Sequence, residues 1–162
     1  MAWNEEDDDF DFGGLENQES DESALEDIRR EDERIQNLPI MIMANQVLET
    51  VEAIIETLPD DDISNHYKRI LIEDALVIAP KIAGAEGADL YTLRMENAVF
   101  VKVAARNLLT QTSGLKMMGL SEPKYLGVLQ SEMESFRELF VDWVKTFDKA
   151  KDIKDSWGLF YD

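Results

Sequence analysis

The chain offers few side chains of the types and spacings that catalysis requires. It contains one histidine, His66, and no cysteine, which excludes disulfides, thiolate metal sites and Cys–His pairs. A di-iron helical bundle needs a Glu-x-x-His motif from each of two helices, and a single histidine cannot supply both. No Gly-rich phosphate loop or Ser–His pair is present, and the carboxylates Glu73, Asp74 and Glu96 are interpreted as surface or helix-end charges. The sequence therefore predicts a protein that is not an enzyme and that uses no metal or cofactor.

One chemical alternative stays open at His66. A histidine phosphotransfer domain needs one exposed histidine on a helix, and Lys68 and Arg69 place two cations close to it. His66 nevertheless lies in the first turn of the predicted helix, and no small residue follows it to let a partner approach. An ordinary surface histidine is the simpler interpretation.

Two long helices, joined at residues 84–87, form the centre of the predicted fold. The first starts at Ile63, where Asp62 or Ser64 can cap it, and the second runs from about Asp89 to Met118. In both helices apolar residues recur at steps of three and four, the period of a helix packed on one face. The first stripe consists of Ile63, Tyr67, Ile70, Leu71, Asp74, Ala75, Ile78, Ile82 and Ala85, and the second of Ala98, Val101, Ala105, Leu108, Thr112 and Leu115.

Two further helices complete the prediction. Pro39 suits a first helical position, and the helix over residues 40–58 has a stripe of Met43, Val47, Val51, Ile54 and Leu58. Ser121 can cap a last helix that runs to about Lys149, with a heptad seam of Leu126, Leu129, Met133, Phe136, Phe140, Trp143 and Phe147. We therefore expect an all-α fold, an antiparallel up-down four-helix bundle over residues 37–150. Residues 1–36 are expected to be a disordered to partly helical acidic arm. Residues 151–162 are expected to be an aromatic tail, of which residues 155–162 fold back on a neighbouring surface or another subunit.

The net charge of −19 is concentrated in the arm. Residues 1–34 hold 15 of the 35 acidic and 3 of the 16 basic residues, a net of −12, which leaves 20 acidic and 13 basic residues, a net of −7, for the rest. Trp3, Phe10 and Phe12 stand among the acids of residues 1–20, which we expect to be mobile. This composition is typical either of a solubilising tail or of a disordered segment that docks on a basic or apolar partner. A short polar helix is predicted from Ser20 to Arg34.

Charge and hydropathy also limit the classes of partner that the chain can bind. Acids outnumber bases in both parts of the chain, so that tight nucleic-acid binding is not expected. A local patch of cations could still form on the central pair, and the candidate partner-binding residues are Trp3, Phe10, Phe12, Lys68, Arg69, Arg94, Lys102 and Arg106. No apolar run approaches the ~20 residues that span a bilayer, and the N-terminus lacks the features of a signal peptide. Together with the absence of cysteine, this predicts a cytoplasmic protein without a membrane partner.

Two stretches of the central pair carry a family resemblance. Residues 75–84 read Ala-Leu-Val-Ile-Ala-Pro-Lys-Ile-Ala-Gly, residues 108–111 read Leu-Leu-Thr-Gln, and Met118-Gly119 follows. They distantly resemble the four-helix-bundle proteins encoded in intervening sequences of bacterial 23S rRNA genes, over roughly Met43 to Phe147. In that family the second helix ends in alanine, isoleucine-proline, then asparagine, isoleucine, alanine, glutamate and glycine. Here the proline is displaced by one residue, Lys81 stands for the asparagine and Gly84 for the glutamate.

The resemblance implies antiparallel bundles that assemble as rings, commonly of five subunits, and it supplies no catalytic residues. Related accessory proteins of diversity-generating retroelements bind nucleic acid through a basic surface, which conflicts with the charge of this chain. Independently, apolar residues such as Val99, Phe100 and Val103 lie off the main stripe, and a four-helix core needs only one stripe per helix. We therefore expect a homo-oligomeric, non-enzymatic adaptor that binds another macromolecule, a protein rather than a nucleic acid. The alternatives are a phosphotransfer domain using His66 and a nucleic-acid-associated accessory protein.

Overall fold

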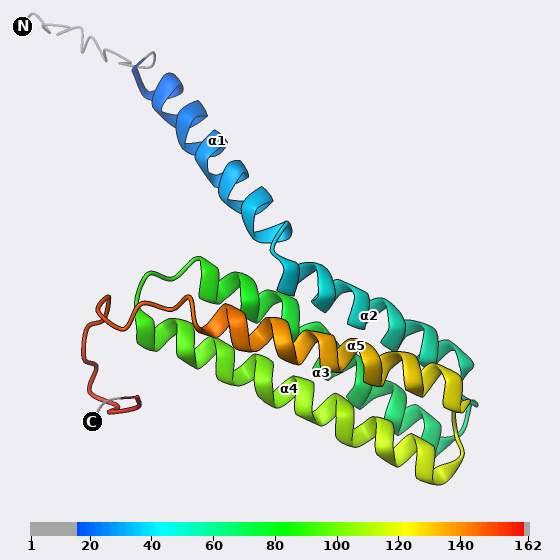
Figure 1. Cartoon of the computed structure of the whole chain (residues 1–162). Coiled ribbons are helices and arrows are strands. Elements are labelled where there is room, and N and C mark those ends of the chain that lie inside the picture. Colours follow the sequence, from blue (N-terminus) through cyan, green and yellow to red (C-terminus); the bar gives the residue numbers. More distant parts are fainter. Residues whose placement is uncertain (1–15, 161–162) are drawn as a thin grey trace, which may run out of the picture. The chain divides into compact units, whose positions relative to one another are not determined.

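A computed structural model describes residues 16–160 of the chain, with side chains from residue 22 onward. Within these residues the structure is all-helical and has no strand, which confirms the predicted all-α class (Figure 1). Its five helices are α1 (Glu16–Gln36), α2 (Pro39–Thr57), α3 (Asp62–Glu86), α4 (Tyr91–Met118) and α5 (Pro123–Val144). No single helix of this part of the chain is long and apolar enough to cross a membrane, and only stretches 22–36 and 39–57 taken together meet the requirements of length and composition.

The chain divides into two compact units, residues 1–34 and 35–162. The first contains most of α1, which extends beyond the predicted polar helix at both ends and has all of its described side chains in this unit exposed. An ion pair one turn apart, Arg30 to Glu26 at 2.7 Å, supports the helix locally. The large apolar residues Leu25 and Ile28 are exposed as well. Of residues 1–20, which were predicted to be mobile, residues 1–15 lie outside the described part and residues 16–20 belong to α1.

The second unit is built mainly from α2 to α5. The helix α2 packs against α3 and α5, and α4 packs against the same two helices, with α3 and α4 in the most extensive contact (Figure 1). Residues 58–61, 87–90 and 119–122 are the short connections between consecutive helices. The largest fully buried side chains are Met41, Ile54, Leu71, Ile78, Ile82, Leu108, Leu115, Leu129 and Phe136. Because full burial of such a side chain is worth roughly 1.5–3 kcal/mol, this shared core holds the four helices together.

The predicted apolar stripes are largely the buried faces. The predicted seam from Leu126 to Phe147 is buried apart from the half-buried Phe140. In the stripe predicted over residues 40–58, Val47, Val51 and Ile54 on α2 and Leu58 just after it are buried. On α3 the buried members are Leu71, Ala75, Ile78, Ile82 and Ala85, and on α4 they are Ala98, Val101, Leu108, Thr112 and Leu115. Several details differ. Ile63 is exposed in the first turn of α3, and Ala104, predicted off the stripe, is buried where Ala105 is only half-buried. The other stripe residues that are only half-buried are Met43, Tyr67, Ile70 and Asp74.

The ends of α3 differ from the prediction. Asp61, rather than Asp62 or Ser64, is the capping residue, since its carboxylate accepts the Ser64 N–H at 2.9 Å and the Ser64 hydroxyl at 3.0 Å. At the other end, Gly84 lies within the helix. A Cβ there would meet the Asn97 Oδ1 atom at 3.2 Å, so this glycine permits a close approach to α4 instead of ending α3. The helix closes at Gly87, whose N–H donates to the Ala83 carbonyl at 2.9 Å.

The ends of α5 also differ. The prediction that Ser121 caps this helix is wrong, because α5 begins at Pro123 with Glu122 before it, and neither provides a side-chain cap. The Ser121 hydroxyl makes no hydrogen bond within the described residues. Proline, with its fixed φ and missing N–H, suits the first turn without a cap. The helix stops at Val144 rather than Lys149, although Phe147 beyond it still packs into the core.

The residues after α5 return to the start of α4. The Lys151 carbonyl accepts the Tyr91 N–H at 2.7 Å, and the Asp152 carboxylate accepts the Thr92 hydroxyl at 2.8 Å and the Thr92 N–H at 3.3 Å. Asp152 thus caps α4, whose own N-cap residue has no side-chain acceptor. From residue 153 to residue 160 the side chains are exposed. Residues 151–152 therefore pack on the start of α4, whereas the described aromatic residues of the tail are exposed, and their packing on another subunit stays a prediction.

Candidate functional site

The candidate site is a groove between α4 and α5, which are in less extensive contact than the α2–α3, α2–α5 or α3–α4 pairs. Its volume is about 700 Å³. The residues that line it are Lys102, Ala105, Arg106 and Leu109 on α4, and Gln130, Met133, Glu134, Phe136, Arg137, Phe140 and Val141 on α5. We call this site the α4–α5 groove.

The side chains along the groove explain its shape and its apolar character. Ala105 is short, so that it leaves space between the two helices that a larger residue would fill. Met133 and Phe136 are buried at the floor, whereas Leu109 and Val141 are 38% and 42% exposed. The apolar surface is therefore accessible to an apolar side chain of a ligand.

Positive charge is left uncompensated on the α4 side of the groove. On the α5 side, the Arg137 Nε donates to the Glu134 carboxylate at 3.1 Å, which lowers the pKa of Glu134 and raises the pKa of Arg137. Lys102 and Arg106 stand one turn apart on α4, and within the described residues their side chains have no ion pair or hydrogen bond. The groove therefore holds two free cations in a chain whose net charge is −19.

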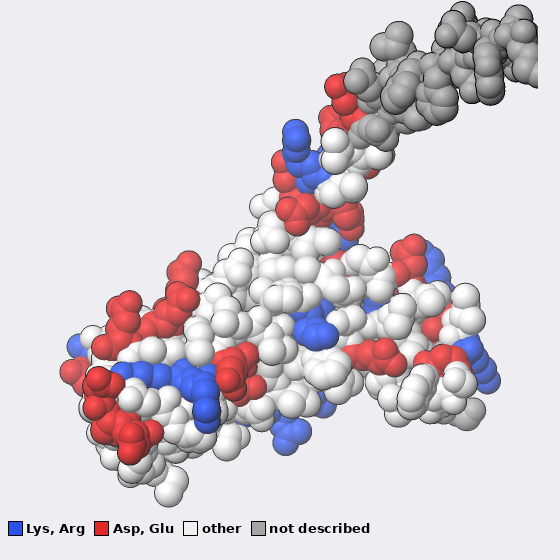
Figure 2. Space-filling view, turned by 180° about the vertical axis from the view of Figure 1, so that it is seen from behind, with Lys and Arg blue, Asp and Glu red and all other residues white. Residues whose placement is uncertain are grey.

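The other predicted cations lie elsewhere. Lys68 and Arg69 line a separate groove of about 670 Å³ between α2 and α3, the α2–α3 groove, where Glu52 and Glu56 balance their charge. On the face shown in Figure 2, Lys and Arg side chains stand in isolated groups near Asp and Glu rather than in a continuous basic surface. The structure therefore does not bring the five candidate cations into one patch.

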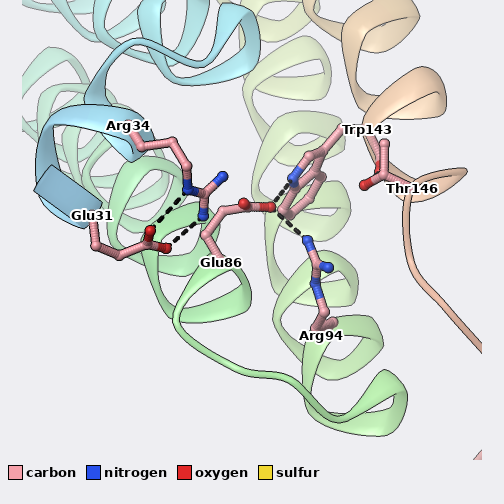
Figure 3. A network of polar contacts seen from close by, with 6 residues as sticks. All are labelled: Glu31, Arg34, Glu86, Arg94, Trp143 and Thr146. Atoms are coloured by element: carbon pink, nitrogen blue, oxygen red, sulfur yellow. Dashed lines mark hydrogen bonds and ion pairs between the residues drawn. The ribbon is translucent and has the colours of Figure 1, made fainter. Parts of the chain in front are cut away.

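Arg94, the fifth candidate cation, is part of a buried polar network (Figure 3). Its Nη2 donates to the Glu86 Oε1 atom at 2.6 Å, and the Trp143 indole N–H donates to the same oxygen at 2.7 Å. The Arg94 guanidinium also lies 4.2 Å from the centroid of the Phe147 ring. The side chains of Glu86 and Arg94 are only 7% and 18% exposed. This network joins the end of α3 to the start of α4 and the end of α5, and it leaves Arg94 little access to a partner.

The other polar residues considered for chemistry have simple surroundings. His66 is exposed, and its Nδ1 lies 3.3 Å from the Arg69 Nη2. Asp74 accepts hydrogen bonds from the side-chain amides of Asn107 at 3.0 Å and Gln111 at 2.6 Å, so that it links α3 to α4. In the part of the chain that the structure describes, no three His, Cys, Asp or Glu side chains are grouped so that they could hold a metal ion.

An exposed apolar face lies on the outer side of the α3–α4 pair. Two contacts set the register of α3 against α4: Asp74 accepts a hydrogen bond from Asn107, and Lys81 lies 4.5 Å from the centroid of the Phe100 ring. Val77 lies between Asp74 and Lys81 on α3. It is therefore opposite the α4 turn that contains Val103. The exposed apolar side chains here are Val77, Val99, Phe100 and Val103, and Phe100 is 54% exposed. We call these four residues the α3–α4 apolar face.

Sequence reasoning found some of these features and missed others. Trp3, Phe10 and Phe12 lie outside the described residues. The role of Glu86 was missed because its partner Trp143 is 57 positions away, and no local pattern marks such a pair. Lys102 could be singled out as the single charge between Ala98 and Ala105, but no local pattern marks the α4–α5 groove that it lines. The sequence matches no known protein-family model, and no curated protein matches it either.

Proposed function

We propose that this chain is a non-enzymatic, self-associating helical adaptor that binds another protein. In this proposal α2 to α5 form an antiparallel up-down four-helix bundle. Short connections and packing between consecutive helices support that topology. The absence of cysteine supports a reducing, cytoplasmic location.

The observation that carries the proposal is the α3–α4 apolar face. Soluble monomers seldom expose contiguous apolar patches larger than a few hundred Å², and each Å² of apolar surface left in water costs roughly 25 cal/mol. Its members come from two adjacent helices and include the largely exposed Phe100. A second copy that covered this face would remove it from water, and closed symmetry is the usual outcome for soluble homo-oligomers.

The negative charge of the chain opposes this association without preventing it. Residues 1–34 carry a net −12, but this charge lies outside the unit that holds the apolar face. At physiological salt the Debye length is about 8 Å, so repulsion between the acidic arms of neighbouring copies is strongly screened. Apolar burial should therefore determine the outcome, and a closed ring is our preferred assembly.

Light scattering on the full chain tests the proposal. We expect a mass well above 18.5 kDa at high micromolar concentration, and a mass nearer to it for the variant Phe100→Ser/Val103→Ser. The matched control is Met117→Ser/Val128→Ser, which removes two exposed apolar residues from outside the face and should leave the mass unchanged. A wild-type mass that stays at 18.5 kDa would refute self-association altogether.

The exposure of His66 supports one rival function, that of a histidine phosphotransfer domain. Its Nδ1 faces Arg69, and the ring is otherwise accessible at the surface, as a phosphotransfer histidine requires. Incubation with phosphodonors, followed by measurement of acid-labile phosphate in wild type and His66→Gln, separates the two proposals. Stable labelling that is lost in His66→Gln would favour the phosphotransfer domain over the adaptor.

A further inference from the structure

The helix α1 carries an apolar pair that nothing in its own unit covers. Leu25 and Ile28 are three residues apart, on one side of the helix, and are 61% and 66% exposed. Glu22 precedes Leu25 by three residues and Asp32 follows Ile28 by four, so both carboxylates flank this pair, together with the single cation Arg29, four residues after Leu25. Neither carboxylate makes an ion pair or side-chain hydrogen bond within the described residues. A polar helix of this length is marginal in water and gains stability by packing its apolar side.

The α4–α5 groove has the complementary chemistry. Its floor is apolar, with Leu109 and Val141 accessible, and its α4 edge carries the uncompensated charges of Lys102 and Arg106. The lengths agree as well. The α5 wall from residue 130 to residue 141 extends over about 17 Å, and the α1 segment from Glu22 to Asp32 over about 15 Å, at a rise of roughly 1.5 Å per residue.

We propose that the α4–α5 groove of one molecule binds α1 of a second copy of this chain. Leu25 and Ile28 enter the apolar floor, and the carboxylates beside them face Lys102 and Arg106, as in other helix-in-groove interactions. The α2–α3 groove is similar in volume but holds Glu52 and Glu56 beside its cations, so it offers an acidic helix no net attraction. The contact is heterologous, joining different surfaces of the two copies, and it can close into a ring.

This inference rests on the proposed self-association and adds a second contact to it. A chain with −19 net charge repels acidic partners in general. A short-range pairing of two free carboxylates with two free cations, over an apolar contact, offsets that repulsion locally. The same chain supplies both surfaces in equal amounts, which is why a second copy is the occupant we assign.

Site-directed photo-crosslinking tests the contact without assuming a register. The chain has no cysteine, so Ala24→Cys, beside the apolar pair on α1, can carry a single benzophenone label. This full-length variant is mixed with isotopically labelled wild type, irradiated and analysed by mass spectrometry. We expect crosslinks to labelled peptides that contain residues 102–109 and 130–141. Crosslinks that map to the α2–α3 groove or to the α3–α4 apolar face, or that stay within one copy, would overturn the inference.

Paired charge reversals provide the matched control. Lys102→Glu/Arg106→Glu in the labelled copy should lower the intermolecular crosslink yield roughly tenfold, because both attractive pairs become repulsive. Lys68→Glu/Arg69→Glu reverses the same charges in the α2–α3 groove and should leave the yield unchanged. Equal losses from the two reversals would refute the assignment to the α4–α5 groove. Light scattering on the same samples distinguishes the groove contact from the proposed self-association. An intact oligomer without groove crosslinks would refute the groove contact and would leave the proposed self-association standing.

Discussion

At the scale of single residues, Glu86 is the shared hydrogen-bond acceptor of the buried polar network in the second unit. One of its oxygens accepts hydrogen bonds from both Arg94 and Trp143, in surroundings that leave the side chain 7% exposed. Arg94 in turn has its Nε without a hydrogen-bond partner within the described residues. Charges in such a site depend on one another, because neither can be solvated if its partner is removed.

We expect Glu86→Ala to destabilise the second unit by about 3–5 kcal/mol, since it leaves the Arg94 charge buried without its carboxylate. Trp143→Phe retains the ion pair and loses one hydrogen bond, so its effect should be smaller, about 1–3 kcal/mol. Urea unfolding followed by circular dichroism measures both. Glu134→Ala, which breaks an exposed pair with Arg137, is the control and should change stability little. Similar losses for Glu86→Ala and Glu134→Ala would contradict the assigned role of the network.

Gly114 is a second single residue on which the packing of the helices depends. It lies within α4, where alanine would normally stabilise a helix by about 1 kcal/mol. A Cβ at this position would lie 2.5 Å from the Tyr67 Oη and 3.2 Å from its Cζ. The glycine is therefore required by the packing of α3 against α4.

Gly114→Ala should lower the free energy of unfolding by about 1–3 kcal/mol in the wild type, the usual effect of overpacking. In a Tyr67→Phe background the closest atom is gone, so the same substitution should be much less harmful or should stabilise. A double-mutant cycle by urea unfolding gives the coupling between the two sites. Additive effects would show that the clash does not determine the stability of Gly114→Ala.

At the scale of elements, two carboxylates define where helices begin. Asp61 caps α3 from the adjacent position in the sequence, whereas Asp152 caps α4 from 60 residues away. Both accept N–H groups that the first turn of a helix leaves unpaired, and both place negative charge at the positive end of the helix dipole. The first lies next to its helix in the sequence, within one residue of the predicted cap Asp62, while the second depends on the path of the chain after α5.

The cap of α3 should make its stability pH-dependent. Hydrogen bonds from the Ser64 N–H and then from the Ser64 hydroxyl lower the pKa of Asp61. The contribution of the ionised cap is therefore complete above the unfolded pKa of about 3.9, and it is lost as the pH falls through the lower folded pKa. We expect wild type to have a higher Tm than Asp61→Asn at pH 7, and this difference to shrink below about pH 4. Asp62→Asn is the neighbouring control; a constant Tm difference between wild type and Asp61→Asn across this range would contradict the assignment.

At the scale of the whole molecule, charge limits what the chain can bind. Its five candidate cations are divided between the α2–α3 groove, the α4–α5 groove and the buried network. Affinity for a nucleic-acid backbone grows with the number of cations that replace counterions together. Two accessible cations in a groove, on a chain of net −19, are too few for tight binding.

We therefore expect that the full chain does not shift labelled RNA in a gel at micromolar concentration and physiological salt. Residues 35–162, the second compact unit, are the informative comparison because they lack the −12 of the N-terminal part. A shift by the full chain would contradict the prediction. A shift by residues 35–162 alone would identify the acidic arm as an inhibitor of RNA binding.

The sequence by itself determined the helical class, most buried faces and several helix ends. The seam of α5 and the stripe of α2 repeat at steps of three and four, and Pro39 begins α2 as predicted. These features are encoded within a few turns, because the helical period brings residues of similar spacing onto one face. The free cations Lys102 and Arg106 could also be named in advance, although not the groove that holds them.

Only the tertiary structure decided which polar groups meet and which apolar residues stay exposed. Glu86 meets Arg94 and Trp143, and Asp152 meets Thr92, through the relative rotation and register of separate helices. Val101 is buried while its neighbour Phe100 is exposed, although both belong to one apolar run. The physical reason is that hydrophobicity drives burial without direction, whereas the packing of one helix against two others selects the side that is covered.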